Sequence, residues 1–284
     1  MFAIRMIPGA APSPQRIAAF VALMATAAVT VACGGPAEMV VNTFPTTPRA
    51  VSEIHRGQAD AVVGDYPVMA HTARESMGQL EVVGSQFDTA QFGIGIRKNS
   101  IDLKPAMVAA LRKIVEDQSY IQALRNWAVH IGAIDPPAAP AGVPAKEAIP
   151  ELQDGKLQVG IELDFAPMEF QDELHKPAGA DVELATALAK ALEVEVEFVN
   201  VKFDTLLDQL TTDKVDVVIS AMTITPERSA EVDFIPYLEM GSGILVAKGN
   251  PHAIKTPQDL CGRTVALQEG TSQIAVLKKV RCWE

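Results

Sequence analysis

Four short aliphatic segments, each followed at once by polar or small residues, constrain the fold of this 284-residue chain most strongly. They lie at residues 157–161, 215–219, 264–267 and 61–63. Continuous aliphatic strands are typical of a parallel sheet that helices cover on both faces. We therefore expect an α/β fold in which the polar groups gather beyond the strand ends.

Segments with apolar residues at helical spacing separate these strands. They span residues 177–192, 203–210, 47–57 and 103–127. The segment 103–127 is broken around 117–119, and Gly57 is placed to cap the segment 47–57. Two further strands, 92–98 and 241–248, have a Gly-x-Gly at or next to their start. Neither has the third glycine and following helix of a dinucleotide site, so we expect hinge strands, with simple turns as the alternative.

Composition and charge exclude several classes of function. The net charge of −11 disfavours nucleic-acid binding, because a phosphate backbone would be repelled. The hydrophobic content of 48% is enough for about two domain-sized cores. The five histidines are scattered without paired ligand spacing, so we expect no metal and no cofactor.

The first 33 residues are typical of a secretory signal. Arg5 and Arg16 precede an apolar run, 17–31, that is shorter than the roughly 20 residues of a spanning helix. Cys33 and its neighbours resemble the lipobox of bacterial lipoproteins, which implies that Cys33 is lipidated. Thr30 departs from that pattern, in which Leu is usual, and plain cleavage near Ala32 is the alternative.

Two further cysteines, Cys261 and Cys282, flank one expected strand and helix. A secreted chain reaches an oxidising compartment, where a local disulfide between them would form. Two buried thiols are the alternative.

Polar groups near the strand ends are complementary to a zwitterion. Arg228 follows a Thr-Pro helix start, and its guanidinium with nearby N–H groups would receive a carboxylate. Asp65 ends the 61–63 strand and would accept an ammonium. Taken singly, Arg228 could be a solvated surface arginine and Asp65 a turn residue. The combination favours a small dipolar ligand.

Other candidates complete this set. Residues 270–273 follow a strand and open a helix, so their N–H groups and hydroxyls could hold the same carboxylate, or simply cap the helix. Phe165 and Phe203 could wall a ligand side chain, or be plain core.

Five segments resemble the polar amino-acid solute-binding proteins of ABC transporters (bacterial extracellular solute-binding proteins, family 3). These are residues 157–168, Phe203, 216–228, 259–273 and 57–65. The resemblance implies that Arg228, Thr223 and Ser272 bind the ligand carboxylate, and that Asp65 and Ser220 bind its ammonium. It implies a side-chain pocket formed by Phe165, Phe203, Glu162 and Gln273, where Ala221 and Glu162 depart from the residues usual in the family.

The same resemblance implies an architecture. It is a periplasmic-binding-protein type 2 fold of two lobes, each a mostly parallel sheet flanked by helices, joined by two hinge strands. The order of segments is exchanged relative to the family, as in a circular permutant, with a truncated or misjoined gene as the alternative. One lobe takes residues 92–134 with 151–240, the other takes 38–91 with 241–284, and 135–150 forms a Pro/Ala-rich linker joining the old ends.

We therefore expect an extracytoplasmic, lipid-anchored, monomeric protein that closes on a free amino acid and delivers it to permease subunits of an ABC transporter. The first alternative is a dehydratase of aromatic amino-acid synthesis on the same scaffold, with Glu162, Asp164 or Glu269 as acid or base. Turnover of prephenate or arogenate would discriminate the two. A sensor or adhesion module is the second alternative.

Overall fold

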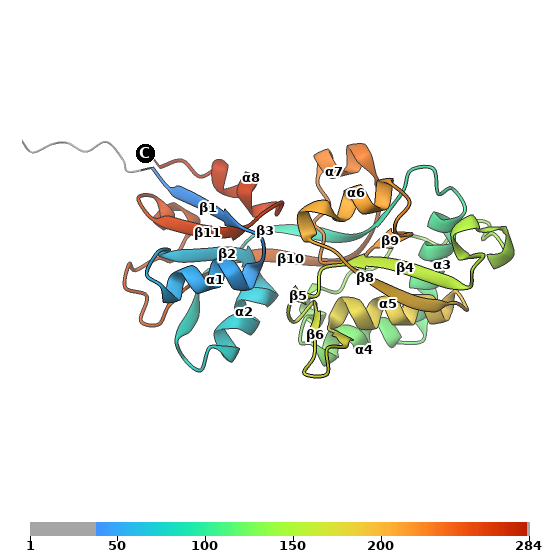
Figure 1. The fold of residues 1–284 in the computed structure, drawn as a ribbon, viewed down its shortest axis with the longest axis horizontal. Helices are drawn as coiled ribbons and strands as arrows, with labels where there is room; N and C mark the ends of the chain where they lie inside the picture. The colour runs from blue at the N-terminus through green and yellow to red at the C-terminus, as the bar shows by residue number, and fades with distance from the viewer. Residues whose placement is uncertain (1–37, 283–284) are drawn as a thin grey trace, which may run out of the picture. The chain divides into compact units, whose positions relative to one another are not determined.

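A single eight-stranded sheet organises residues 38–282, the part of the chain that the computed structural model describes (Figure 1). Its strand order is β1-β11-β2-β10-β3-β9-β4-β8. The strands are β1 (Val40–Phe44), β11 (Thr264–Gln268), β2 (Ala61–Asp65), β10 (Asp233–Ala247), β3 (Leu80–Ile96), β9 (Val217–Val218), β4 (Lys156–Ile161) and β8 (Glu195–Asn200). The predicted signal segment and Cys33 lie outside the described residues.

The sheet has two parallel ends and an antiparallel middle. Strands β1, β11 and β2 run parallel to one another, as do β9, β4 and β8. We call these groups the β11 half and the β4 half. The long strands β3 and β10 pair antiparallel with each other and join the halves. The predicted α/β fold with mostly parallel strands is therefore confirmed.

Helices cover both faces of the sheet. In the β11 half, α1 (Thr47–His55) and α2 (Tyr66–Glu75) cover one face of the sheet, and α8 (Gln273–Lys278) covers the other (Figure 1). In the β4 half, one face is covered by α3 (Leu103–Glu116), α4 (Ser119–Asn126) and α5 (Ala180–Ala191). The other face of that half is covered by α6 (Leu206–Thr211) and α7 (Pro226–Glu231). A small sheet of β5 (Asp164–Phe165), β6 (Glu169–Gln171) and β7 (Pro177–Ala178) precedes α5.

The predicted helix breaks are confirmed. Helix α3 ends before Asp117 and α4 begins at Ser119, with the intervening Gln118 in the left-handed region at φ 70°. Gly57 follows α1 with φ 67°, a conformation that glycine adopts without a steric penalty.

The two predicted hinge strands are parts of longer ones. Segment 92–98 is the end of β3, and 241–248 is the end of β10. Their ladder contains register shifts between Pro236 and Leu238, between Met240 and Ser242, and between Ser242 and Ile244. Both predicted lengths were too short, because cross-strand hydrogen bonds carry the ladder past the glycines.

One apolar core continues across both halves, while two smaller cores are local. The largest cluster joins residues of α1 and α2, such as Val51 and Met69, to residues of α3 and α5, such as Leu111 and Leu188. Separate clusters lie under α8 and under α6. The shared cluster makes the two halves one folded unit.

The Pro/Ala-rich segment 135–150 packs against the β4 half at both ends. Arg112 donates hydrogen bonds to the carbonyls of Pro136 and Pro137 and pairs with Asp135. At the other end Ile149 is 1% exposed, and Arg97 pairs with Glu151 at 3.2 Å. Prolines that are held this way make the segment a strap along the surface rather than a free spacer.

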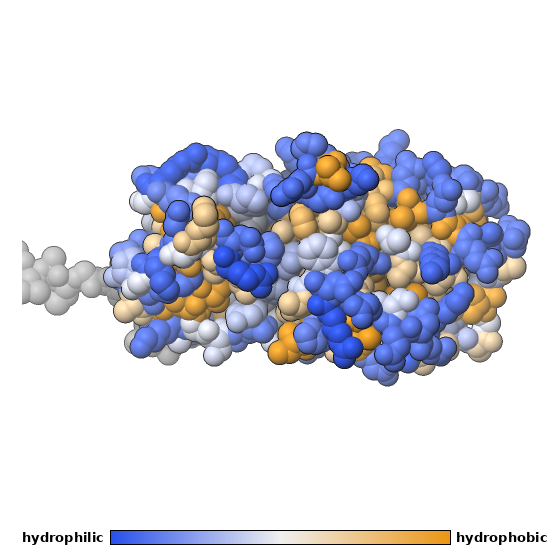
Figure 2. Space-filling view, turned by 90° about the horizontal axis from the view of Figure 1, so that it is seen from below, coloured by the Kyte–Doolittle hydropathy of each residue, from blue (hydrophilic) through white to orange (hydrophobic). Residues whose placement is uncertain are grey.

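On the face seen in Figure 2, hydrophobic residues are interspersed among hydrophilic ones. Within residues 38–282, no helix combines the length and the apolar character that crossing a membrane requires.

The structure contains the disulfide Cys261–Cys282, which closes a loop of 21 residues around β11 and α8. Closing a loop of this length removes entropy from the unfolded chain and stabilises the fold by about 3 kcal/mol. Replacing both cysteines by serine should therefore lower the free energy of unfolding by about 3 kcal/mol, measured by urea denaturation. A reductant should destabilise the parent chain similarly and leave the double variant unchanged; equal stability of parent and variant would contradict the entropic account.

Candidate functional site

Polar residues at the ends of β2, β4, β9 and β11 come together, although these strands belong to different halves of the sheet. Gln268 at the end of β11 donates from Nε2 to Glu162 Oε2 at 2.5 Å, just beyond β4. The Gln268 amide oxygen accepts from Thr47 Oγ1 at 2.7 Å, at the start of α1. All three side chains are buried. The predicted convergence of strand ends on one region is therefore what the structure contains.

Arg228 lies in the first turn of α7 because Thr225 caps this helix and Pro226 begins it. Its guanidinium Nη1 donates to the Thr223 carbonyl at 2.6 Å. Its Nη2 donates at 2.9 Å to the carbonyl of Gly270, a residue of the β11 half. The guanidinium carbon lies 5.4 Å from the centre of the Phe203 ring, a cation–π contact. Arg228 is thus anchored between the two halves instead of projecting into solvent.

Asp65 ends β2 in the β11 half and is buried. It stands at the N-cap of α2 without a capping hydrogen bond from its side chain. Its Oδ1 instead accepts from Gln273 Nε2 at 2.8 Å, and Gln273 also donates to Ser242 Oγ. Burial raises the pKa of Asp65 to about 7, although the Gln273 hydrogen bond and the positive charge of Arg228 both lower it.

Arg228 and Asp65 act on each other electrostatically. Burial lowers the pKa of Arg228, and the Asp65 carboxylate opposes this shift. The two predicted charges therefore come from opposite halves of the sheet and share one region.

Thr223 and Ser272 meet across the same boundary, where Ser272 Oγ donates to Thr223 Oγ1 at 3.2 Å. Gly270 precedes this contact with φ 73°, and an added Cβ would lie 3.0 Å from Asp204 Cβ in the other half. A larger residue here would strain the backbone and crowd Asp204.

The remaining predicted residues divide into boundary and interior positions. Phe203 is half-buried beneath Arg228, whereas Phe165 is buried in the largest apolar cluster. Burial raises the pKa of Glu162, opposed by its hydrogen bonds from Gln268 and the Phe203 N–H. The Ser220 hydroxyl turns to the interior, where it donates to Glu169 and accepts from the Glu162 N–H.

Sequence reasoning missed Gln268 and Thr47 as parts of this network. Gln268 is the last residue of a strand whose end we expected to be polar, so the strand-end rule contained the signal for it. It also missed Glu169 and Asp181, two fully buried acids behind Ser220. Asp181 lies on the apolar face of α5, three, four and seven residues before apolar positions of that helix. A charged residue on an apolar face is the sequence feature that could have indicated a buried acid.

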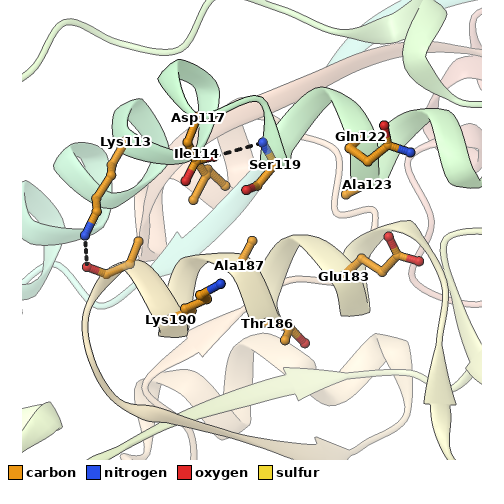
Figure 3. A pocket seen from close by; sticks show the side chains of 11 residues that line it. Lys113, Ile114, Asp117, Ser119, Gln122, Ala123, Glu183, Thr186, Ala187 and Lys190 are labelled. Carbon is orange, nitrogen blue, oxygen red and sulfur yellow. Dashed lines mark hydrogen bonds between the residues drawn. The ribbon is translucent and has the colours of Figure 1, made fainter.

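One pocket borders this region, and another lies away from it. A cavity of about 460 Å³ between α1, α2 and the β5–β6 segment is lined by Thr47, Leu163, Asp164 and His71, among others, and so borders the Thr47–Gln268–Glu162 network. A second pocket of about 420 Å³ lies between α3–α4 and α5 (Figure 3), and none of the predicted site residues lines it. Among the described residues, no group of three or more His, Cys, Asp and Glu side chains is placed to hold a metal.

Similarity to known proteins is concentrated in the second part of the chain. Residues 157–280 match the family model of the bacterial extracellular solute-binding proteins, family 3. This segment contains the predicted residues around β4, β9 and β11, whereas Asp65 lies outside it.

Three curated relatives cover about the same extent. The L-cystine-binding protein TcyJ of Escherichia coli (strain K12) is 42% identical over 119 residues, 42% of this chain and 45% of that protein. The ABC transporter arginine-binding protein 1 of Escherichia coli (strain K12) is 38% identical over 118 residues, 41% and 47% of the two chains. The arginine-binding extracellular protein ArtP of Bacillus subtilis (strain 168) is 39% identical over 118 residues, 42% and 46% of the two chains.

The aligned part therefore spans somewhat less than half the length of the curated relatives. Residues 157–280 are therefore similar to the bacterial extracellular solute-binding proteins, family 3.

Proposed function

We propose that this chain binds a free amino acid and acts as the substrate-binding component of an ABC transporter. The family of residues 157–280 supports this proposal, as do relatives that are named as cystine-, arginine- and histidine-binding proteins. These relatives are named as binding proteins rather than enzymes, which favours transport over the dehydratase alternative.

The observation that carries the proposal is that Arg228 of the β4 half donates to the Gly270 carbonyl of the β11 half, and that Gln273, at the start of the helix that follows Gly270, donates to the buried Asp65. An amino acid offers a carboxylate to Arg228, Thr223 and Ser272, and an ammonium to Asp65 and Ser220. In the structure, two backbone carbonyls and Gln273 already satisfy Arg228 and Asp65. A ligand would take over some of these hydrogen bonds, so that its own charges are paired while water is excluded.

Closure of the two halves on the ligand follows from the contacts between them. Arg228 bonds to Gly270, Ser272 to Thr223 and Gln268 to Glu162, and each pair joins the β4 half to the β11 half. The irregular β3–β10 ladder is the connection about which they would rotate. A ligand that contacts both halves has higher affinity for the closed form and shifts the population towards it.

The ligand side chain would extend towards Phe165, Phe203, Glu162 and Gln273. Glu162 contributes a buried carboxyl group to this pocket, and its hydrogen-bond partner Gln268 contributes an amide. These two groups already bond to each other, and a polar or basic side chain could bond to them in addition, whereas an aliphatic one could not.

We also propose that the chain is a circular permutant with lobes formed by 92–134 with 151–240 and by 38–91 with 241–284. The β11 half supports this division: β1, near the start of the described chain, pairs in parallel with β11, near its end, with Val40 opposite Thr264. The strap 135–150 would then join the former ends.

Cellular location and partners belong to the same proposal. The similarity to a family of extracellular proteins supports a site on the outer side of the cell membrane, where a lipid on Cys33 would hold a monomeric protein close to permease subunits. The disulfide Cys261–Cys282 agrees with an oxidising compartment.

The replacement Arg228→Ala tests the carboxylate contact. A thermal-shift screen of the common amino acids, including L-cystine, L-arginine and L-histidine, identifies the ligand by its increase in melting temperature. Calorimetry should then show at least about a 100-fold loss of affinity in the variant, because removing one partner of a buried charge pair costs about 3 kcal/mol or more. The exposed Arg125 on α4 supplies the matched control, Arg125→Ala, which should bind normally. Unchanged affinity of Arg228→Ala would refute the assignment.

The pKa of Asp65 predicts how affinity depends on pH. The ammonium binds the ionised carboxylate, whose pKa in the free protein is about 7. Below that pH the ligand must displace a proton, so affinity should fall about tenfold for each pH unit from 7 to 5 and level off above 7. Calorimetry in buffers of different ionisation enthalpy should detect the released proton. Asp65→Asn should bind weakly at every pH and lose the dependence; a parental affinity independent of pH would exclude Asp65 as the ammonium acceptor.

Restoring the family order of segments tests the permutation. A chain in which residues 150–284 precede residues 38–134 should fold to similar stability and bind the same amino acid within a few-fold, because each strand keeps its neighbours. Residues 150–284 alone should remain unfolded, since β10 and β11 would lack β2 and β3. Circular dichroism and calorimetry provide the readouts. A reordered chain that does not fold would count against the proposed division.

A further inference from the structure

Two fully buried acids, Glu169 on β6 and Asp181 at the start of α5, lie behind the candidate site. Asp181 Oδ2 accepts from the Ala221 N–H at 2.6 Å and from the Tyr237 hydroxyl at 2.7 Å. Glu169 Oε1 accepts from Ser220 Oγ at 2.7 Å. Each acid thus uses one of its two oxygens as an acceptor.

The other two oxygens, Glu169 Oε2 and Asp181 Oδ1, have no donor among the described residues. A buried carboxylate oxygen without a donor is costly, and two adjacent negative charges away from water are more costly still. A single proton between the two carboxyls resolves both problems, since one acid then donates to the other. The Asp181 N–H donates to the carbonyl of Met168, next to Glu169, so the two carboxyls lie close enough for each to shift the pKa of the other.

The proton belongs on Glu169. Burial raises the pKa of Glu169 well above its ordinary value, and the neighbouring Asp181 raises it further. Burial also raises the pKa of Asp181, but only to about 6, because the Ala221 N–H and the Tyr237 hydroxyl stabilise its carboxylate. Asp181 is therefore the ionised member at neutral pH.

The groups that this pair holds are parts of the candidate site. Ala221, bonded to Asp181, has a left-handed backbone with φ 43°, a conformation that is strained for a residue other than glycine. The same turn contains Ser220 and leads to Thr223. Ser220 Oγ also accepts from the Glu162 N–H at 3.1 Å, so the pair supports two strand ends at once.

We propose that Glu169 and Asp181 share one proton and act as positioning residues, holding the turn 220–223 and the backbone at Glu162 in the geometry that the site requires. This inference rests on the proposed function only in assigning that turn to ligand binding. The charged and titratable groups that face the pair are Glu162, Asp65 and the Tyr237 phenol, all of them acids. Further negative charge nearby favours retention of the shared proton.

Infrared spectroscopy of the full chain in D₂O tests for the proton. At pH 8 the parent should show the C=O stretching band of a protonated carboxylic acid, and Glu169→Gln should lack it. Asp181→Asn should lack it as well, because its amide can donate to Glu169 in place of the proton. The exposed Glu147 supplies the control Glu147→Gln, which should keep the band. A parent without the band would overturn the proposal.

Hydrogen exchange, followed by mass spectrometry, tests the positioning role on the peptide covering 217–224. Glu169→Gln preserves a donor towards Asp181 and an acceptor for Ser220, so its protection should stay within about twofold of the parent. Glu169→Met removes both and should exchange at least about tenfold faster. As the pH rises from 8 to 10, protection corrected for intrinsic rates should fall in the parent and persist in Glu169→Gln.

Equal loss of protection in Glu169→Gln and Glu169→Met would overturn the shared proton, since an ionised Glu169 would then be required, and unchanged protection in Glu169→Met would overturn the positioning role. If Glu169→Gln does not fold, the infrared band of the parent and its loss in Asp181→Asn still decide whether the proton is shared. Neither readout needs an amino acid, so a failure of the proposed function would appear separately, as a parent chain that shows the band but binds no ligand.

Discussion

The antiparallel pairing of β3 with β10 is the constraint on which the rest of the structure depends. Strand β10 pairs with β2 of the β11 half and β3 pairs with β9 of the β4 half, so their mutual ladder joins parallel strands that are far apart in sequence. Without this ladder, Asp65 and Arg228 would belong to separate units. The register shifts in its middle are the irregularity about which two otherwise regular halves can reorient.

Buried negative charge is the second organising feature. Asp65, Glu162, Glu169 and Asp181 all lie inside the protein, and burial raises the pKa of each. Arg228 is the cation that acts on Asp65, while hydrogen bonds from amide groups, hydroxyls and a shared proton serve the others. Such an arrangement is stable when every acceptor has a donor, and it leaves one carboxylate free to exchange an amide partner for an ammonium.

Several elements were predictable because local patterns determine them. The aliphatic runs of β2, β4 and β11, the break between α3 and α4 at Gln118, and the Thr-Pro start of α7 all follow from the sequence, and so does the general location of Arg228 beside a helix start. The lengths of β3 and β10 were not predictable in this way, because pairing partners more than a hundred residues away extend them beyond their own apolar patterns.

The sequence by itself determined the residue types at the strand ends, and thus the acid, base and hydroxyl groups available to a dipolar ligand. Packing in three dimensions settles which of them meet: Gln268 with Glu162, Ser220 with Glu169, and Asp181 with the Ala221 N–H. The physical reason is that spacing along the chain sets the direction of a side chain within its own helix or strand. The partner that satisfies it depends on packing between elements that the chain brings together from a distance.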